Sequence, residues 1–473
     1  MTLNPQKLYS HIDHAWGNLL PTLEQYIRIP NKSPHFDPKW QEHGHMDRAV
    51  ELLVNWAKTQ PIANMRIEVQ RLPGRTPLIC IEVAGNSERT VLLYGHLDKQ
   101  PEMAGWDPTH GPWDPVIKDQ KLYGRGAADD GYAIFAALTA IQALQAQNIS
   151  HDRCVILIEA SEESGSPDLQ AHMQVLKDRM GKPALVICLD AGCGNYDQLW
   201  VTTSLRGLAG GELRVDVLTE GVHSGYASGV VPSSFRIIRQ LLSRIEDEDT
   251  GELKIKETHA PIPAWDLEKT KEAALILGSP AQDYPFMPAT QPTTHDPIEQ
   301  LLNRTWRPAL SVVGAEGLPS SANAGNVLRP STSLKLSLRL PPNCDAQGAA
   351  EALKKALENE PPYGAKVSFE ITEAKTGWQI GEISRDLEAL FNQVSRTYFD
   401  DRPAAYWGEG GAIPFMNILK DEFPQAQFMV TGVLGPHSNA HGPNEFLHLP
   451  TARKITCCVA NVLSGFFSSG HSR

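Results

Sequence analysis

The sequence predicts an α/β protein in which a mainly parallel sheet flanked by helices is interrupted by a smaller α+β domain. Strand-like and helix-like patterns alternate over the first 204 residues, alternating strand patterns replace them from Leu205, and a helical pattern resumes after about residue 376. A chain of 473 residues also exceeds a single hydrophobic core, which stops growing at about 250–300 residues. We therefore expect one domain from 1–204 and 376–473, and a second domain, 205–375, inserted into it.

The first domain carries the patterns of a parallel sheet. Apolar residues recur at helical spacing in 48–58 and 169–180, and residues 131–145 are apolar nearly all round, which indicates a buried helix. Strands are predicted at 65–69, 78–83, 91–94, 155–159 and 185–189. A strand, a helix and a strand in that order form a right-handed crossover, so we expect the core of the sheet to be parallel.

The second domain has antiparallel character. Its predicted elements are strands at 211–218, 333–340 and 365–372 and helices at 233–245 and 346–358, with a polar stretch rich in Pro and Thr at 260–297. Two strand–helix–strand pieces of this kind make a small α+β sandwich. A helix at 386–399 returns the chain to the first domain.

Composition limits the partners that we expect. The formal net charge of −12 argues against nucleic acid and anionic membranes, both of which favour basic surfaces. No apolar stretch reaches the roughly 18–20 residues of a membrane span, and no secretory signal is visible at the N-terminus. The seven cysteines are an odd number and lie mostly in apolar runs, which predicts buried free thiols in a reducing cytoplasm.

Metal-type side chains follow five apolar runs or flexible loops. The segments are TVLLYGHLD, LYGRGAADDG, CVILIEASEESGS, ALVICLD and GPHSNAHGPNEF. In open α/β sheets the ligand crevice lies outside the carboxyl ends of the strands, so these acids and imidazoles are expected to converge. Their convergence predicts a two-metal hydrolytic site.

The first two segments offer ligands and helix caps alike. His96 and Asp98 lie on the same side of a strand end, where the histidine suits a ligand and the aspartate suits its orienting partner. A histidine beside a capping aspartate is the alternative. Asp129 and Asp130 precede a predicted helix, so we expect one of them to cap it and Asp129 to bridge two metals.

The remaining segments supply further candidates. Glu162 and Glu163 are adjacent acids that repel each other without a cation, and a metal site can use one as ligand and the other as general base. An exposed acidic turn is the alternative, and a turn-forming role is the alternative for Asp190. Spacing does not decide between His437 and His441 in the late loop. Nitrogen and oxygen ligands without cysteine favour zinc, with manganese or cobalt as alternatives.

At these residues the chain resembles the co-catalytic zinc peptidases, which include carnosinases, aminoacylases, glutamate carboxypeptidases and succinyl-diaminopimelate desuccinylases. The motifs GHLD, GRGAADDG, EASEESGS, ICLDAG, VHSG and AHGPNEF occur in family order through nearly the whole chain. The resemblance implies two zinc ions that share Asp129, one held also by His96 and Asp190 and the other also by Glu163 and His441.

The same resemblance implies roles for further residues of the first domain and for the inserted domain. Glu162 is expected as the general base and Asp98 as the partner of His96. In the inserted domain, His223 is expected to cross a dimer interface and stabilise the substrate oxyanion in the neighbouring subunit, and Arg339 to bind the substrate carboxylate. A lone surface histidine and a structural ion pair are the respective alternatives. Three further residues resemble substrate-facing positions: Asn326, Gly410 and Gly411.

The resemblance is nearest to the carnosinase-type dipeptidases. Asp190 and the segment WRPALSVVGAEG before SLRLPP carry this similarity. The implied function is cleavage of dipeptides or short peptides by metal-activated water, in a cytoplasmic homodimer whose inserted domain serves dimerisation. An N-acyl amino acid amidohydrolase with the same residues is the alternative. A non-catalytic scaffold is disfavoured because all five ligands and the base are present, and no Gly-x-Ser-x-Gly elbow of a serine hydrolase occurs.

Overall fold

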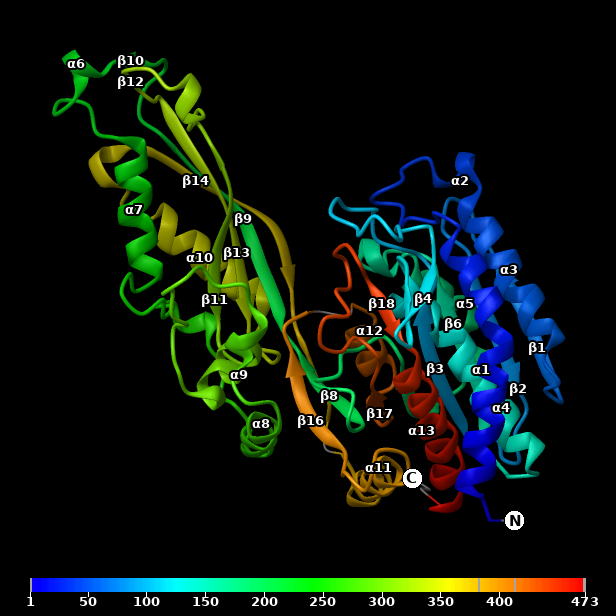
Figure 1. Cartoon of the computed structure of the whole chain (residues 1–473). Helices are drawn as coiled ribbons and strands as arrows, with labels where there is room; N and C mark the ends of the chain where they lie inside the picture. Colours follow the sequence, from blue (N-terminus) through cyan, green and yellow to red (C-terminus); the bar gives the residue numbers. More distant parts are fainter. Residues whose placement is uncertain (1, 382, 412–413, 471–473) are drawn as a thin grey trace. The chain divides into compact units, whose positions relative to one another are not determined.

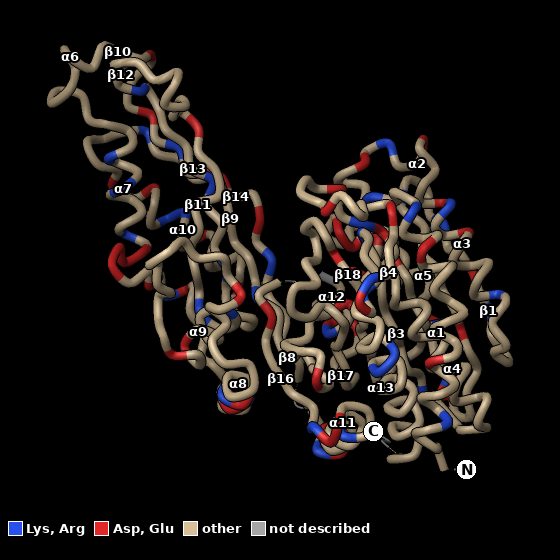
Figure 2. Tube along the Cα trace, in the orientation of Figure 1, with Lys and Arg blue, Asp and Glu red and all other residues tan. Residues whose placement is uncertain are grey.

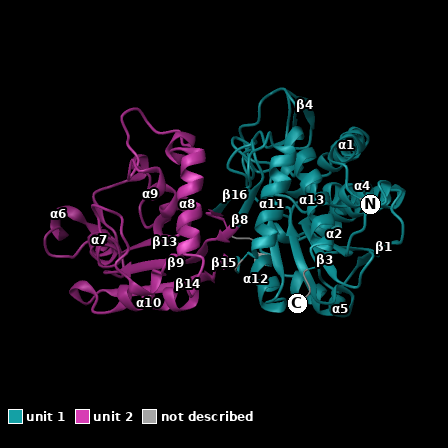
Figure 3. Ribbon diagram, turned by 90° about the horizontal axis from the view of Figure 1, so that it is seen from below, with its two compact units in different colours: residues 1–202, 380–407, 413–473 teal, residues 203–379, 408–412 magenta. Residues whose placement is uncertain are grey.

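The computed structural model describes residues 2–381, 383–411 and 414–470. Figure 3 shows the two units into which the chain divides. Unit 1 consists of Met1–Thr202, Ile380–Trp407 and Ile413–Arg473, and unit 2 consists of Thr203–Gln379 and Gly408–Ala412. The chain therefore leaves unit 1 and returns to it, and a short segment after residue 407 groups with unit 2.

Unit 1 is built on a six-stranded sheet with the order β1-β2-β6-β3-β7-β17. Its strands are β1 (Met65–Gln70), β2 (Leu78–Val83), β3 (Thr90–His96), β6 (Arg153–Glu159), β7 (Pro183–Cys188) and β17 (Gln427–Val430). Strands β6, β3, β7 and β17 run parallel, whereas β1 and β2 pair antiparallel at one edge. Nearly every residue of β3 and β6 is buried, as in central strands covered on both faces. The predicted, mainly parallel sheet is confirmed.

Helices accompany this sheet. They are α1 (Pro5–Ile27), α2 (Trp40–His43), α3 (His45–Thr59), α4 (Ala133–Ala146), α5 (Leu169–Met180), α11 (Arg385–Tyr398), α12 (Pro414–Glu422) and α13 (Leu449–Ser468). Helix α4 is buried nearly all round because it packs against α1, α13 and β3, as its apolar sequence predicts. Figure 1 shows α1 and α13 side by side. Helix α1 is absent from the sequence-based prediction, although its buried residues recur at helical spacing.

Unit 2 contains a four-stranded antiparallel sheet with the order β11-β13-β9-β14. Its strands are β9 (Gly207–Asp216), β11 (Ala309–Glu316), β13 (Ser331–Leu340) and β14 (Lys366–Lys375). Helices α7 (Ser234–Ile245) and α10 (Ala346–Glu358) pack on one face, where alternate residues of β9 and β13 form the core. The hydroxyl of Ser233 and the carboxylate of Asp345 cap these helices. The predicted α+β domain is confirmed.

The remaining helices and strands lie outside the two sheets described above. They are β4 (Val116–Lys118), β5 (Lys121–Tyr123), β8 (Trp200–Leu205), β10 (Val222–His223), α6 (Ser224–Ala227), α8 (Ala264–Leu277), α9 (Pro297–Thr305), β12 (Val327–Leu328), β15 (Trp378–Gln379), β16 (Ala405–Glu409) and β18 (Phe446–His448). Helix α8 lies inside the polar stretch 260–297, and Ala273 and Ala274 are among its buried residues.

Two further observations concern the distribution of charge and the apolarity of the helices. In Figure 2, Lys and Arg positions are interspersed with Asp and Glu rather than gathered on one face. Among the residues that the structure describes, no helix combines the length and apolarity needed to span a bilayer.

Candidate metal centre and substrate-facing residues

The metal-type side chains of unit 1 follow the carboxyl ends of its parallel strands. Strand β3 ends at His96, Glu162 and Glu163 follow β6, and Asp190 follows β7. Because β3 pairs in parallel with both β6 and β7, these ends share one edge of the sheet. The sheet topology is therefore what brings residues from three separate segments together.

His96, Asp129 and Asp190 form the first cluster. His96 Nε2 lies 3.2 Å from Asp129 Oδ1 and 3.7 Å from Asp190 Oδ2. All three residues are buried, and one ligand atom from each lies within 4.8 Å of the others. One nitrogen and two oxygens at this spacing suit a divalent cation.

Asp129, Glu163 and His441 form the second cluster. His441 Nε2 lies 3.0 Å from Asp129 Oδ2 and 3.3 Å from Glu163 Oε2. Asp129 thus directs one oxygen to each histidine and belongs to both clusters. His437, the alternative in the same loop, is exposed and joins neither cluster of the described residues.

Asp98 holds the turn that carries the two glutamates. Its Oδ1 accepts a hydrogen bond from the backbone N–H of Glu162 at 3.1 Å, and its Oδ2 accepts one from that of Glu163 at 3.0 Å. Its Oδ1 also lies 3.5 Å from His96 Nδ1, whose closer neighbour is the Asp98 carbonyl at 3.1 Å. The carboxylate therefore links the His96 segment to the Glu162–Glu163 segment, a contact that strand spacing alone does not predict.

Asp130 does not cap the helix that follows it, which corrects the sequence-based expectation. Helix α4 begins at Ala133 without a side-chain cap. Asp130 Oδ2 instead accepts a hydrogen bond from the backbone N–H of His96 at 3.1 Å. The reason is local: residues 127–131 form a wide turn in which Asp129 and Asp130 depart from helical backbone angles, so the carboxylate faces β3 rather than the helix end.

The acids of the site lie in a buried space that disfavours their charge. Burial and neighbouring carboxylates raise the pKa values of Glu162, Glu163 and Asp190 well above the usual range. Burial would also raise the pKa of Asp129, but hydrogen bonds from His441 and His96 outweigh it and lower that pKa. Partial desolvation works against a charge on His441, whose side chain is 55% exposed, yet Asp129 and Glu163 raise its pKa to about 9.

These observations fit bound cations. Glu163 Oε1 is buried and has no hydrogen-bond partner among the described residues. An unpartnered carboxylate oxygen surrounded by further acids is costly unless a positive charge neutralises it. The donor set, imidazole nitrogen and carboxylate oxygen without sulfur, suits zinc and also manganese or cobalt.

Three side chains support the clusters without having been predicted. Gln100 donates a hydrogen bond to Glu163 Oε2 at 2.6 Å. Arg125 and Glu445 form a buried ion pair at 2.7 Å, and Glu445 Oε1 accepts from the backbone N–H of Asp129 at 3.3 Å. Arg125 also donates to the Gly442 carbonyl at 2.7 Å, next to His441. Arg125 lies inside the motif GRGAADDG and Glu445 inside the motif AHGPNEF, so their place in these motifs was the sequence feature that could have marked them as site residues.

Two of the predicted residues of unit 2 lie together on the β10–β12 ribbon. His223 is exposed at the end of β10, and its Nδ1 accepts a hydrogen bond from the Gly225 N–H at 3.0 Å. The Asn326 carbonyl accepts from the Ser224 N–H at 2.9 Å. Neither residue belongs to the two clusters of unit 1.

The other predicted residues of unit 2 lie elsewhere in it. Arg339 is on β13, opposite Leu208 of β9, and is partly exposed. Gly410 and Gly411 follow β16, and the next two residues of the GEGGAIP segment, 412 and 413, lie outside the described residues.

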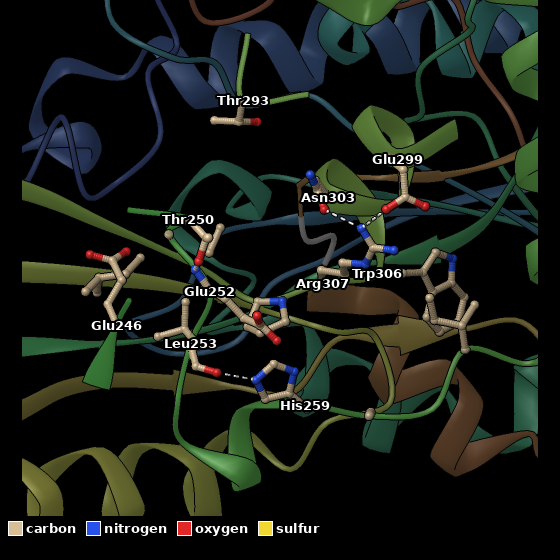
Figure 4. Close-up of a pocket in the computed structure, with 16 residues that line it drawn as sticks. Glu246, Thr250, Glu252, Leu253, His259, Thr293, Glu299, Asn303, Trp306 and Arg307 are labelled. Carbon is tan, nitrogen blue, oxygen red and sulfur yellow. Dashed lines mark hydrogen bonds and ion pairs between the residues drawn. The ribbon is translucent and has the colours of Figure 1, made fainter. Parts of the chain in front are cut away.

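A cavity of about 740 Å³ also lies in unit 2. Figure 4 shows two of its polar side chains paired within the lining: His259 Nε2 donates to the Leu253 carbonyl at 2.7 Å, and Arg307 contacts Glu299 at 2.6 Å and Asn303 Oδ1 at 2.8 Å. None of the predicted site residues lines it. The chemistry of the two clusters is therefore separate from this cavity.

Solved structures share the fold over nearly the whole chain. A structure of the dipeptidase Dug1p from Saccharomyces cerevisiae superposes with a TM-score of 0.77 and 21% identity, covering 100% of both chains. A structure of human carnosine dipeptidase 1 gives 0.75 and 20%, covering 99% of both chains. At these identities the likeness shows the fold.

Sequence relatives cover most of the chain as well. A cysteinylglycine-S-conjugate dipeptidase of Corynebacterium striatum is 26% identical over 443 residues, which are 90% of this chain and 92% of that protein. The beta-Ala-His dipeptidase of Homo sapiens is 25% identical over 439 residues, 88% of this chain and 84% of that protein. The model of Peptidase family M20/M25/M40 matches residues 92–464, a range that contains both clusters. The resemblance drawn from the motifs is thereby confirmed: the chain is a peptidase and belongs to Peptidase family M20/M25/M40.

Proposed function

We propose that the protein is a metal-dependent dipeptidase that uses two divalent cations, zinc first among them. The observation that carries the proposal is the pair of three-residue clusters sharing Asp129. The relatives named as dipeptidases, for S-conjugated cysteinylglycine and for beta-Ala-His, support dipeptides as the substrate class.

The residues of the clusters would hold the cations. His96, Asp129 and Asp190 would bind one, and Asp129, Glu163 and His441 the other. Two cations bridged by a carboxylate lie about 3.5–4 Å apart in hydrolases and supply Lewis acidity toward water and the scissile carbonyl.

Glu162 is proposed as the general base. It lies in the turn that follows β6 and belongs to neither cluster, and its backbone N–H donates a hydrogen bond to Asp98. A carboxylate at this position would accept a proton from the attacking water and pass it to the leaving amine. Through its contacts with the Glu162 N–H and with His96 Nδ1, Asp98 would hold these two residues in fixed positions relative to each other.

His223 is proposed to act in the site of a second copy of this chain. Its Nδ1 accepts the Gly225 N–H, so the proton of the neutral ring lies on Nε2, which can donate to a substrate oxyanion. Exposed apolar residues lie near it in the sequence, with Tyr226 at 88% and Val230 at 83% exposure, and favour burial against a partner. A homodimer through unit 2 would provide that burial.

The remaining proposals concern the substrate and the cellular compartment. Arg339 is proposed to bind the substrate carboxylate, with Asn326, Gly410 and Gly411 facing the substrate. A cytoplasmic location is supported by the seven cysteines of the described residues, all of which are buried and none of which forms a disulfide. N-acyl amino acids are the alternative substrates, since the same clusters could hydrolyse a blocked amine.

Metal analysis followed by a substrate panel tests the proposal. Protein purified and loaded with zinc, manganese or cobalt is assayed against Ala-Xaa, carnosine-like and Cys-Gly dipeptides, and against N-acetyl and N-succinyl amino acids. We expect metal-dependent hydrolysis of dipeptides. Hydrolysis of N-acyl amino acids alone would replace the proposal by its alternative, and no hydrolysis in any metal form would remove it.

A further inference from the structure

Glu159 is a buried acid at the end of β6, in unit 1, and is 2% exposed. Among the described residues its carboxylate has three hydroxyl partners and no Lys or Arg partner. Burial and the charge of Asp98 raise the pKa of Glu159 to about 7, although hydrogen bonds from Tyr94 and Ser166 act to lower it. Keeping an acid in these surroundings costs free energy, which its hydrogen bonds must offset.

Two of these hydrogen bonds reach the two ends of the turn that carries Glu162 and Glu163. Glu159 Oε2 accepts from Ser161 Oγ at 3.3 Å, and Oε1 accepts from Ser166 Oγ at 2.9 Å. Ser161 directly precedes the two glutamates, and Ser166 follows them. The Ser161 carbonyl also accepts from the Ser166 N–H at 2.9 Å. The carboxylate and this backbone hydrogen bond together close the turn 161–166.

The backbone of Ser166 explains why that end of the turn needs a contact. Its φ is +54°, in the left-handed region, and it follows Gly165, whose φ is +85°. A residue with a Cβ atom is disfavoured in that region unless its surroundings hold it there. Ser166 is only 4% exposed, and its hydroxyl is directed to Glu159. The hydrogen bond therefore stabilises a turn conformation that serine would otherwise avoid.

The third hydrogen bond connects the turn to β3. Glu159 pairs with His96 across the parallel strands, and Tyr94 lies two residues before His96, so their side chains share one face of the sheet. Tyr94 Oη donates to Glu159 Oε1 at 2.6 Å. The Glu159 carbonyl accepts from the Leu97 N–H at 2.8 Å. The turn is thereby fixed relative to the strand that carries His96.

Two carboxylates thus act on the same turn. Asp98 accepts hydrogen bonds from the backbone N–H groups of Glu162 and Glu163, in the middle of the turn, whereas Glu159 binds the serines at its ends. We propose that Glu159 is a positioning residue whose hydrogen bonds to the two serines hold Glu162 and Glu163 in the geometry that the reaction needs. This inference rests on the proposed function. The competing interpretation is that Glu159 contributes only to the stability of the fold.

Removing one serine hydroxyl at a time tests this role. Ser161→Ala and Ser166→Ala each release one end of the turn from Glu159. Ser87→Ala is the matched control, because the Ser87 hydroxyl donates to Asp152, a fully buried acid directly before the other end of β6. All three variants lose the same kind of hydrogen bond, and only two of them lose it at the turn.

The kinetic readout separates positioning from stability. In metal-loaded protein, Ser161→Ala and Ser166→Ala should lower kcat for a dipeptide by about 10- to 100-fold, the usual effect of losing a group that orients a metal ligand, and change KM by less than about twofold. Ser87→Ala should change neither. Lower melting temperatures with wild-type kcat in all three variants would overturn the inference.

The conservative variant at Glu159 itself provides a second test. Glu159→Gln keeps the shape of the side chain, and its amide oxygen can still accept from Tyr94 and Ser166. We therefore expect it to retain most of the kcat that Glu159→Ala loses. Equal kcat in folded Glu159→Ala and wild type would contradict the positioning role. Should Glu159→Ala fail to fold, the two serine variants still decide.

Metal titration distinguishes failure of this inference from failure of the proposed function. Calorimetric titration of the metal-free protein with zinc requires no turnover. Because Glu163 belongs to only one of the two clusters, Ser166→Ala should weaken one binding event by about 10- to 100-fold and leave the other within about twofold. That result supports the positioning role even if the wild type cleaves no dipeptide. Unchanged zinc binding together with unchanged kcat overturns the inference while leaving dipeptide hydrolysis untouched.

Discussion

At the scale of single residues, the site depends on a carboxylate whose two oxygens serve different neighbours. Asp129 Oδ1 lies 3.2 Å from His96 and Oδ2 lies 3.0 Å from His441. Glu162 lies beside this arrangement without joining it, which separates the metal ligands from the group proposed to move the proton. Changes at Glu162 should therefore affect turnover and metal content differently.

Glu162→Ala tests that separation. We expect turnover to fall by about 10²–10⁴-fold, the usual contribution of a general base, while the metal content per chain stays at the wild-type value. Steady-state kinetics and elemental analysis of the same preparation measure both. Glu51→Ala, a change of the same kind at an exposed position, is the control. Wild-type turnover in Glu162→Ala would remove this residue from the mechanism.

A second residue-scale prediction concerns Asp266 in unit 2. Burial raises the pKa of Asp266 to about 6, and its Oδ1 is buried without a hydrogen-bond partner. The folded state then holds a proton that the unfolded state releases, so this group costs stability as the pH rises from about 4 to 6. Asp266→Asn should melt about 2–4 °C above wild type at pH 7.5 and lose that advantage at pH 4. Calorimetry at the two pH values checks this, and a pH-independent difference would contradict it.

At the scale of elements, the strand ends position the proposed metal ligands, and contacts between loops hold them in place. The parallel order of β6, β3 and β7 follows from apolar runs separated by a helical pattern, so the convergence of His96, Glu163 and Asp190 could be predicted from the sequence. The contacts between the loops could not be predicted, because they join residues more than 300 positions apart in the sequence, such as Arg125 and Glu445. The role of Asp130 could not be predicted either, because its hydrogen bond with the His96 N–H becomes visible only when the turn is packed against β3.

Glu445→Gln tests the role of the Arg125–Glu445 ion pair. Breaking a buried ion pair while leaving one charge costs about 3–5 kcal/mol, and here the pair holds both the Asp129 turn and the His441 loop. We expect a lower melting temperature and loss of metal on dialysis against a weak chelator. Glu24→Gln, which breaks the exposed pair with Arg28 at 3.6 Å, should have little effect. Retention of both metals by Glu445→Gln would show that the pair serves stability alone.

At the scale of the whole molecule, the proposed reaction uses residues of both units. The clusters and Glu162 belong to unit 1, whereas His223 and Arg339 belong to unit 2. The change of strand pattern at Leu205 and the helical pattern after about residue 376 predicted the interrupted chain, and motif order predicted the peptidase family.

Complementation tests whether the working molecule is a dimer that shares residues between subunits. His223→Ala and Glu162→Ala should each be impaired with metal retained. Refolding or exchanging the two together should restore about a quarter of wild-type turnover, because half of the random dimers contain one site with both native residues. A mixture no more active than its components would confine His223 to its own subunit or exclude it from the reaction.

Metal stoichiometry of Asp129 variants tests the shared carboxylate most directly. After dialysis against metal-free buffer, elemental analysis should find about two divalent cations per wild-type chain, about one in Asp190→Ala and about none in Asp129→Ala. Two cations retained by Asp129→Ala, or none bound by folded wild type supplied with metal, would contradict a pair of cations bridged by this residue.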